Sequence, residues 1–583
     1  MTSPLARPAA TFASHRAALE SRDRASLAAD LVMLVAVAVL LYLLIRLSYR
    51  VAGPIVQVPT PTEFSTNPLN LPYYALRSLT RMFTALGASL VFTFVYATAA
   101  AKSRRAERVL IPLLDVLQSV PVLGFLSITI TLWLAMFPGT ELGVELASIF
   151  AIFTAQVWNL TFAFYQAQVT QSKELAEAAV MFRLNRWQRF WRLDAPSGVI
   201  PLVWNGMMSF GGGWFFLIAS EVITVNRHEY ALPGIGSFVA TASNNGETSK
   251  VWLAIAAMMA MVIGVDLLFW RPLVAWSARF RTGDEVTESR SAVLNLLRRS
   301  NLPRLLARLF SPLGRAISRA ARVFGQTRPS DEVVRGRAGD WIFNAVVLGV
   351  IGFGLVRFAM YVHSGVGIGE FAVAARLGGF TFLRVIVLLV FASLIWVPIG
   401  VWIGLNPTVA RFAQPVVQVL ASFPANFLFP FIGAFLIATN VSLDIGGVVL
   451  MALGAQWYIL FNVIAGAAAI PRDLRDVAAN LRLGRVARWR TLYGPAVFTS
   501  WVTGSITAAG GAWNASIVAE VVTFDGHTLT AHGLGAYITT ATTEGDLSRT
   551  LIGVVVMSLF VVGLNRLVWQ PLYTRAERRY TYA

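Results

Sequence analysis

Long apolar segments recur along the whole chain and are separated by polar connections. Twelve such segments can be marked, each near the roughly 20 residues that a membrane-spanning helix requires. They lie at about 28–50, 76–100, 110–136, 145–168, 198–223, 251–276, 340–362, 379–404, 413–438, 443–467, 497–522 and 549–573. The pattern predicts an all-α polytopic membrane protein with about 12 transmembrane helices.

Composition and charge support this interpretation. Hydrophobic residues make up 56% of the chain, the mean hydropathy is +0.63, and Cys is absent, which excludes disulfides and thiolate metal sites. Most connections predicted to face the cytoplasm are basic, whereas those predicted to face outside are poor in Lys and Arg. Both termini are predicted to be cytoplasmic. The net charge of +18 is therefore mainly a topology signal and not a nucleic-acid footprint.

The second half of the chain repeats the first. Gly211-Gly-Gly-Trp214 returns as Gly510-Gly-Ala-Trp513, and Glu221 and Gly234-x-Gly236 return as Glu520 and Gly533-x-Gly535, always 299 residues later. Upstream, Arg81 matches Arg384 at an offset of 303. Each half holds six predicted spans, an even number, so both enter the membrane in the same direction. This predicts a parallel repeat with a pseudo-two-fold axis along the membrane normal.

Two polar loops, 174–196 and 473–495, interrupt the apolar pattern at equivalent places. Each begins with acidic and small residues at helical spacing and ends with Arg and aromatic residues before a Pro. Between these parts stands Asn185 in the first loop and Gly484 in the second, residues that tolerate a left-handed backbone. We predict a short helix, a turn at that residue, and a second helix entering the membrane.

These loops resemble the EAA loop of permease subunits of type I ABC importers, in which the loop docks on a cytoplasmic ATPase. The resemblance implies a bacterial inner-membrane protein that works with an ATPase dimer, which binds ATP and Mg, and with an extracytoplasmic solute-binding protein. No cofactor is expected in this chain. By resemblance the ATPase-coupling residues are Glu174, Glu177, Ala178, Ala179, Asn185, Asp473, Asp476, Val477, Ala478 and Gly484.

The Gly-Gly-x-Trp, Glu and Gly-x-Gly pattern that follows each loop looks like the nitrate, sulfonate, taurine and bicarbonate group of these permeases, which implies import of a small anion. Polar, Trp and Glu side chains within the apolar runs are candidates for a translocation pathway or gate, or for interhelical packing. For Glu221 and Glu520 we favour a structural role, in which each glutamate locks the outer loop in place. The candidates are Gln118, Ser119, Gln156, Asn205, Trp214, Glu221, Ser422, Gln456, Trp513, Asn514 and Glu520.

Other classes of function are less well supported. No G-x-x-x-x-G-K-[ST] phosphate loop or hydrolase motif occurs, so the chain is predicted not to be an enzyme. His228 and His527 have no spacing typical of a metal site, and none is predicted. The alternative is a secondary, ion-coupled transporter of six plus six helices, for which Asp266 and Arg357 would be the relay candidates.

The predicted organisation has four parts. Residues 1–27 form a cytoplasmic N-terminal segment, 28–282 the first permease half with its core at 76–276, and 340–583 the second half with its core at 379–575. A basic cytoplasmic linker, 283–339, joins them. We favour a tether for this linker over an amphipathic helix on an anionic membrane surface, because positive-inside bias explains most of its Arg residues.

Overall fold

The computed structural model describes residues 64–280 and 337–580, apart from a few single positions in connecting segments and the tips of two hairpins. The N-terminal segment, the predicted span at 28–50 and the linker up to residue 336 lie outside the described residues. The described part falls into two units: residues 163–205 and 264–280 belong to one, and residues 64–162, 206–263 and 337–580 to the other.

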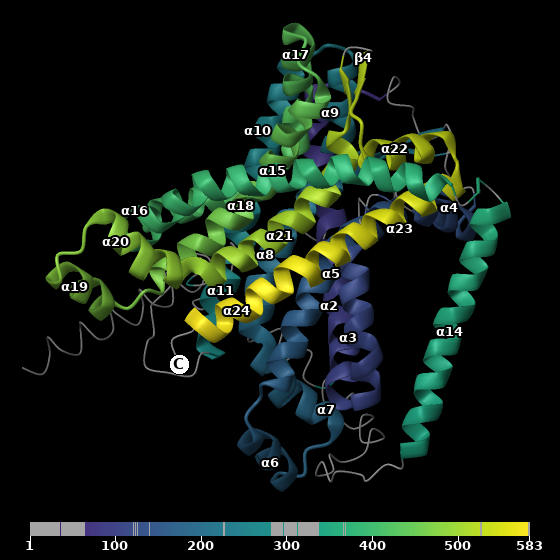
Figure 1. Cartoon of the computed structure of the whole chain (residues 1–583). Coiled ribbons are helices and arrows are strands. Elements are labelled where there is room, and N and C mark those ends of the chain that lie inside the picture. Colours follow the sequence, from purple (N-terminus) through teal and green to yellow (C-terminus); the bar gives the residue numbers. More distant parts are fainter. Residues whose placement is uncertain are drawn as a thin grey trace, which may run out of the picture. The chain divides into compact units, whose positions relative to one another are not determined.

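Helices dominate both halves (Figure 1). The elements of the first half are η1 Pro68–Asn70, α2 Leu71–Lys102, α3 Arg104–Ser119, α4 Leu126–Met136, α5 Leu142–Val169, α6 Lys173–Met181, α7 Arg186–Arg189, η3 Phe190–Asp194, α8 Ala195–Glu221, β1 Val222–Val225, β2 His228–Ala231, α9 Ile235–Asn244, α10 Thr248–Val265, η4 Asp266–Trp270, α11 Arg271–Ser277 and η5 Ala278–Phe280.

The second half contains a matching series after α14 Arg337–Ser364, whose predicted equivalent at 28–50 lies outside the described residues. Its elements are α15 Glu370–Leu405, α16 Pro407–Ser422, η7 Ala425–Leu428, α17 Phe429–Thr439, α18 Leu443–Ala468, α19 Arg472–Asn480, α20 Arg485–Arg488, η8 Trp489–Tyr493, α21 Gly494–Ala519, β3 Val521–Phe524, β4 His527–Thr530, α22 Leu534–Glu544, α23 Leu547–Leu564, η9 Asn565–Trp569 and α24 Gln570–Tyr580.

The repeat extends to local irregularities of the backbone. Each half has two π-helical turns, η3 and η4 in the first and η8 and η9 in the second, and both pairs are 299 residues apart. Each half also has an antiparallel two-stranded hairpin, β1–β2 or β3–β4, with Val222 opposite Ala231 and Val521 opposite Thr530. Since π turns are rare in helices, their duplication supports the predicted internal repeat.

Seven helices in the described part of the chain are long and apolar enough to cross a membrane, or eight if one bent pair forms a single span. The structure differs from the predicted spans at 110–136 and 413–438, which are each broken into two helices, α3 with α4 and α16 with α17. The second break bends the chain by 77°. A Ser-x-Pro sequence stands at each break, and the residue before the Pro, Val120 or Phe423, is extended, because Pro disfavours a helical conformation there.

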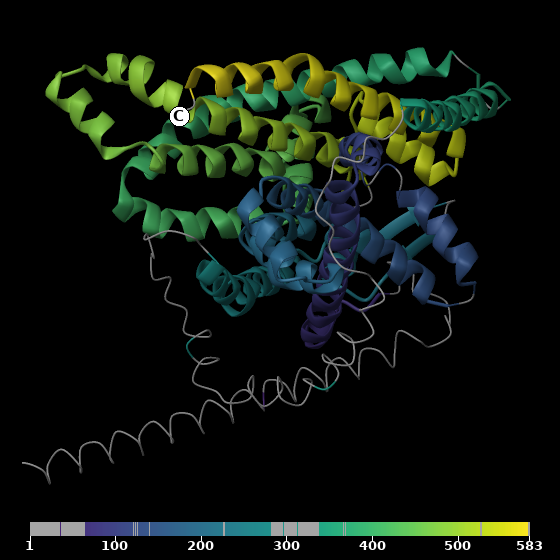
Figure 2. The ribbon, with the colours of Figure 1, turned by 90° about the horizontal axis from the view of Figure 1, so that it is seen from below.

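The helix α21 lies in the interior of its half, against α15 and α18 (Figures 1 and 2). Its sequence is rich in Gly, Ala, Ser and Thr, and it is not among the seven helices that have the length and hydropathy of a membrane span. Gly504 permits the close approach, because a Cβ there would lie 2.9 Å from the Tyr458 carbonyl oxygen of α18. Small residues of this kind are typical of helix contacts inside a membrane bundle.

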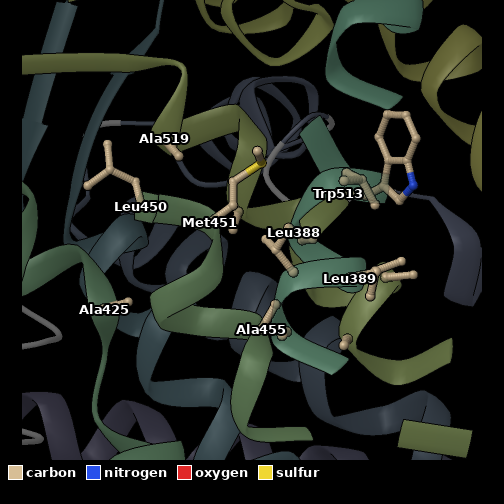
Figure 3. Packing of buried hydrophobic residues seen from close by; sticks show 14 of the residues in the cluster. Leu388, Leu389, Ala425, Leu450, Met451, Ala455, Trp513 and Ala519 are labelled. Carbon is tan, nitrogen blue, oxygen red and sulfur yellow. The ribbon is translucent and has the colours of Figure 1, made fainter. Parts of the chain in front are cut away.

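Large apolar side chains of α15 and α18 complete this core. Leu388 and Leu389 of α15 pack near Met451 and Ala455 of α18 and near Trp513 of α21 (Figure 3). All five are at most 5% exposed. The core therefore fixes α21, and with it the segments at both of its ends, to the other helices of the second half.

Candidate functional site

The first predicted coupling loop is a nine-residue helix, α6, followed by a tight turn. The Ser172 hydroxyl caps the start of α6 by accepting a hydrogen bond from the Leu175 N–H at 3.4 Å. Ala179 is 3% exposed, whereas Glu174 and Glu177 lie on the exposed face. The short helix thus rests on its small residues and presents both carboxylates to solvent.

The second loop reproduces this geometry in α19. Ala478 is 5% exposed, while Asp473, Asp476 and Val477 are exposed. Leu483 donates a backbone hydrogen bond to the Ala478 carbonyl at 3.2 Å, and the corresponding bond of the first loop joins Leu184 to Ala179 at 3.1 Å. Both helices therefore end in the same way, with a bond across five residues.

The predicted turn residue is wrong in both loops. Arg183 and Arg482 adopt the left-handed conformation, each with φ of 49°, two positions before Asn185 and Gly484. Asn185 instead begins the next helix: its side chain accepts from the Gln188 N–H at 2.7 Å, and the Gln188 side chain accepts from the Asn185 N–H at 3.1 Å. In both loops the left-handed residue instead closes the preceding helix: Arg183 donates to Val180 and Arg482 to Ala479, each at 2.9 Å, and the next residue bonds across five residues.

Large apolar side chains are exposed at the end of each coupling helix. Met181 and Phe182 are 83% and 78% exposed in the first loop, and Leu481 is 65% exposed in the second. Exposed apolar groups beside carboxylates are typical of a surface that a partner covers.

The opposite, predicted outer end of α8 carries a buried carboxylate. Glu221 is fully buried and accepts hydrogen bonds from the Ser78 hydroxyl at 2.5 Å, from Arg81 Nη1 at 2.7 Å and from the backbone N–H of Gly236 at 2.6 Å. The same Ser78 hydroxyl accepts from the Ile235 N–H at 3.2 Å. One carboxylate therefore ties α2, the end of α8 and the start of α9 together.

The charges around Glu221 balance. Arg81 also contacts Glu145 of α5 through Nε and Nη2, at 2.7 and 2.8 Å, and Arg77 forms an ion pair with the same carboxylate. Each of the four side chains is at most 5% exposed. We call Arg77, Arg81, Glu145 and Glu221 the first Glu cluster; it holds two cations and two anions.

The second half builds the same arrangement around Glu520 with different charges. Glu520 accepts from the Thr381 hydroxyl at 2.7 Å, from Arg384 Nη1 at 2.8 Å and from the Ala536 N–H at 3.1 Å. Arg384 also pairs with Asp444 at 2.5 Å. We call Arg384, Asp444 and Glu520 the second Glu cluster.

The second cluster lacks one cation. Phe380 stands at the position of Arg77, so one guanidinium faces two carboxylates. His532, whose side chain is 79% exposed, places Nδ1 3.0 Å from the Asp444 carboxylate. The two halves therefore differ in the charge balance of otherwise equivalent sites.

The two Glu clusters explain why glycine is required at the first position of each Gly-x-Gly motif. A Cβ on Gly234 would lie 2.2 Å from the Glu221 carboxyl carbon, and one on Gly533 would lie 2.1 Å from Glu520 Oε2. Neither glycine has a positive φ, so the space taken by the carboxylate, and not the backbone conformation, requires them.

We expect Gly533→Ala to displace the Glu520 carboxylate and to lower the thermal unfolding midpoint of the purified chain. Gly379→Ala is the matched control, because nothing lies within 4 Å of a Cβ there and Ala favours a helix. Tryptophan fluorescence during heating measures both. An equal midpoint for the two variants would contradict the steric explanation.

The other pathway candidates lie in several different environments. Trp214 and Trp513 are each 1% exposed, and Gln156 is fully buried against Gly213. Gln456 accepts a hydrogen bond from Trp396 at 2.9 Å. Their roles in a pathway stay predictions.

Some candidates bond to the backbone. Asn514 accepts from the Val122 N–H at 2.9 Å, and Asn205 donates to the Pro201 carbonyl at 2.9 Å. Ser422 is 7% exposed, Ser119 is the last residue of α3, and Gln118 is exposed.

The sequence reasoning missed most members of the two clusters. Glu145, Asp444 and Arg77 stand at or next to the first residue of an apolar segment and are not among the candidates chosen from the sequence. The signal that could have identified them is that charged residues recur at equivalent positions of the two halves, within or beside predicted spans. A charged side chain there is costly in a membrane unless it is paired.

The family model for binding-protein-dependent transport system inner membrane components matches residues 89–270 and 396–579. The two matches cover more than half of the chain, one in each half. The chain belongs to this family of ABC importer permeases. The alternative of a secondary transporter is therefore not supported. Asp266 pairs with Arg271 at 2.8 Å and Arg357 is exposed, which gives no sign of a relay.

Individual permeases show the same relationship. The chain is 27% identical to the nitrate import permease protein NrtB of Leptolyngbya laminosa over 32% of its length and 63% of the relative. It is 25% identical to the taurine transport system permease protein TauC of Escherichia coli over 34% and 68%, respectively. It is 27% identical to the bicarbonate transport system permease protein CmpB of Synechococcus elongatus over 30% of its length and 60% of the relative. This permease thus spans less than two thirds of the nitrate and bicarbonate relatives.

Proposed function

We propose that this permease forms the translocation pathway of an ATP-driven importer of a small anion in a bacterial inner membrane. The observation that carries the proposal is the pair of equivalent coupling helices, α6 and α19, in a chain of the permease family. Two such helices in one chain suit a pair of ATPase subunits, one on each loop. A single polypeptide then supplies both halves of the pathway.

The solute is inferred from relatives and not from charge. The names of the similar permeases specify nitrate, taurine and bicarbonate; nitrate and bicarbonate are singly charged anions near neutral pH, and taurine carries one sulfonate whose charge its ammonium group balances. The basic residues of the chain are no argument for an anion, because most stand in the predicted cytoplasmic loops. An extracytoplasmic binding protein would deliver the solute to the hairpin side of the permease, opposite the coupling loops.

Reconstitution tests the proposal. The full chain is purified with its candidate ATPase, placed in liposomes, and supplied with the candidate binding protein and nitrate, taurine or bicarbonate. We expect ATP hydrolysis to rise and one anion to accumulate only when ATP and binding protein are both present. Accumulation driven by an ion gradient without ATP, or no associated ATPase, would overturn the proposal.

A further inference from the structure

Arg183 and Arg482 adopt a backbone conformation that disfavours their residue type. Each follows a coupling helix, α6 or α19, and has φ of 49°. In this left-handed region the Cβ of an L-residue crowds the backbone, so Gly, or sometimes Asn, is usual. Among the residues that the structure describes, the non-Gly positions with positive φ are Asn440 and these two arginines. The arginines are therefore the exceptions, and they stand at equivalent positions, 299 residues apart.

The way in which each coupling helix ends imposes this conformation. In both loops the arginine N–H donates to a carbonyl three residues earlier at 2.9 Å. The next residue donates across five residues, at 3.1 Å in the first loop and 3.2 Å in the second. These two bonds form the Schellman motif, in which the position after the helix is left-handed and Gly is the common residue. Any residue here must take this conformation, and Gly would take it at a lower cost than Arg.

The two arginine side chains contribute nothing to their own loops. Both are exposed, and within the described residues neither guanidinium forms a hydrogen bond or an ion pair. Other arginines of the loops do have partners: Arg189 pairs with Asp194 at 3.5 Å, and Arg488 donates to the Leu483 carbonyl at 2.9 Å. Each loop thus bears the unfavourable backbone without a compensating contact from the side chain.

A general preference for positive charge does not explain these positions. The positive-inside bias favours basic residues in cytoplasmic loops but specifies no position within them. Arg186 and Arg485, three residues later, are also exposed and supply the same charge from right-handed helical backbone. The location of Arg183 and Arg482 therefore requires a reason beyond charge.

The neighbouring surface indicates what the guanidinium groups bind. Phe182 is 78% exposed beside Arg183, and Leu481 is 65% exposed beside Arg482. Protein interfaces have apolar centres with polar rims, and Arg is enriched among the residues that contribute most to binding. A carboxylate is the acceptor that a guanidinium binds through two parallel hydrogen bonds. The pair of an apolar side chain and an Arg thus fits an apolar hollow with a carboxylate at its rim.

We propose that Arg183 and Arg482 each bind a carboxylate of the ATPase subunit seated on their loop, and that the left-handed turn holds each guanidinium beside the apolar side chain. The proposal rests on the proposed function, because it takes the ATPase as the partner of α6 and α19. It separates two quantities that a merely structural role would change together: replacing these arginines weakens association and does not lower the stability of the chain.

The test is the double variant Arg183→Asn with Arg482→Asn, in the full chain in lipid nanodiscs. The probe is the ATPase that copurifies with the wild-type chain. We expect the dissociation constant to rise at least about tenfold and to depend less on salt. The unfolding midpoint of the chain alone should stay equal or rise, because Asn tolerates the left-handed backbone. The double change to Gly should give the same two results. The double change to Lys, which keeps the charge without the two parallel bonds, should fall between.

The matched control is Arg186→Gln with Arg485→Gln, which removes equal charge from exposed positions. We expect it to change the dissociation constant less than about twofold. An equal loss in this control overturns the proposal, because the ATPase would then respond to the charge of the loop as a whole. A lower unfolding midpoint in both the Asn and Gly variants also overturns it, since the arginines would then serve the fold.

Two further outcomes separate the possible partners. A loss of binding that appears only in nanodiscs with phosphatidylglycerol assigns the arginines to anionic lipid and overturns the proposal. Undiminished binding of the ATPase to the Asn variant overturns the arginine assignment alone and leaves the proposed function standing. A wild-type chain with which no ATPase copurifies overturns the proposed function and this inference with it.

Discussion

Reversing one charge in each coupling loop, Glu177→Arg together with Asp476→Arg, is expected to abolish stable association with the ATPase and to reduce coupled ATP turnover more than tenfold. Both carboxylates are exposed on nine-residue helices whose small residues, Ala179 and Ala478, are buried. The substitutions therefore change the presented surface and leave the packing of the loop intact. Removal of one partner of a buried interfacial charge pair costs about 2–5 kcal/mol, and a reversal adds repulsion.

Copurification of the ATPase and ATP turnover in liposomes measure this effect. Glu544→Arg is the matched control, since Glu544 is an exposed carboxylate at the end of α22 on the predicted opposite side of the membrane. The two single variants show whether the loops contribute equally. If the double variant copurifies with the ATPase like wild type and keeps coupled turnover, α6 and α19 are not the coupling helices.

Neutralising the two buried glutamates is expected to have unequal effects on stability. Glu221→Gln leaves Glu145 as the one carboxylate that is ion-paired with Arg77 and Arg81 among the described residues, so the first Glu cluster holds two buried cations and one buried anion. Such a loss of one buried partner typically destabilises by about 3–5 kcal/mol.

Glu520→Gln has a different electrostatic result. It leaves one buried cation, Arg384, paired with one partly exposed carboxylate, Asp444, so the remaining charges of the cluster become balanced. The expected loss of about 1–3 kcal/mol comes from weaker hydrogen bonds to Thr381 and to the Ala536 N–H. We therefore expect the unfolding midpoint to fall further for Glu221→Gln than for Glu520→Gln.

A compensating change separates charge balance from shape. Arg77→Met in the Glu221→Gln background restores one cation to one anion, and we expect it to recover part of the lost stability. Glu544→Gln, at an exposed position, is the control for the loss of a carboxylate as such. Equal midpoints for Glu221→Gln and Glu520→Gln, or no recovery in the double variant, would contradict the charge-balance explanation.

The difference between the clusters bears on how the halves work. The first cluster is sealed, with every charged side chain at most 5% exposed, whereas Asp444 of the second is 37% exposed. Each cluster holds the helix that follows its hairpin, α9 in the first half and α22 in the second. Both helices line a cavity of about 390 Å³. The halves thus share one architecture but anchor the predicted outer end through clusters that differ in charge balance and in exposure.

The sequence determined the features that depend on local pattern and on repetition. Apolar length gave the helical membrane class, and equal spacing gave the duplication. The small residues Ala179 and Ala478, which the structure buries, were identified by resemblance to the EAA loop. The left-handed turn at Arg183 and Arg482 is a local feature that the sequence did not reveal, because it depends on how each helix ends, with Leu184 bonded to Ala179 and Leu483 to Ala478.

Tertiary structure decided what depends on neighbours distant in the chain. The glycines Gly234 and Gly533 are required by carboxylates 13 residues earlier, which no backbone preference indicates. The cavity is lined by α8 and α9 of the first half and by α17, α21 and α22 of the second, so it depends on segments that are far apart in the chain.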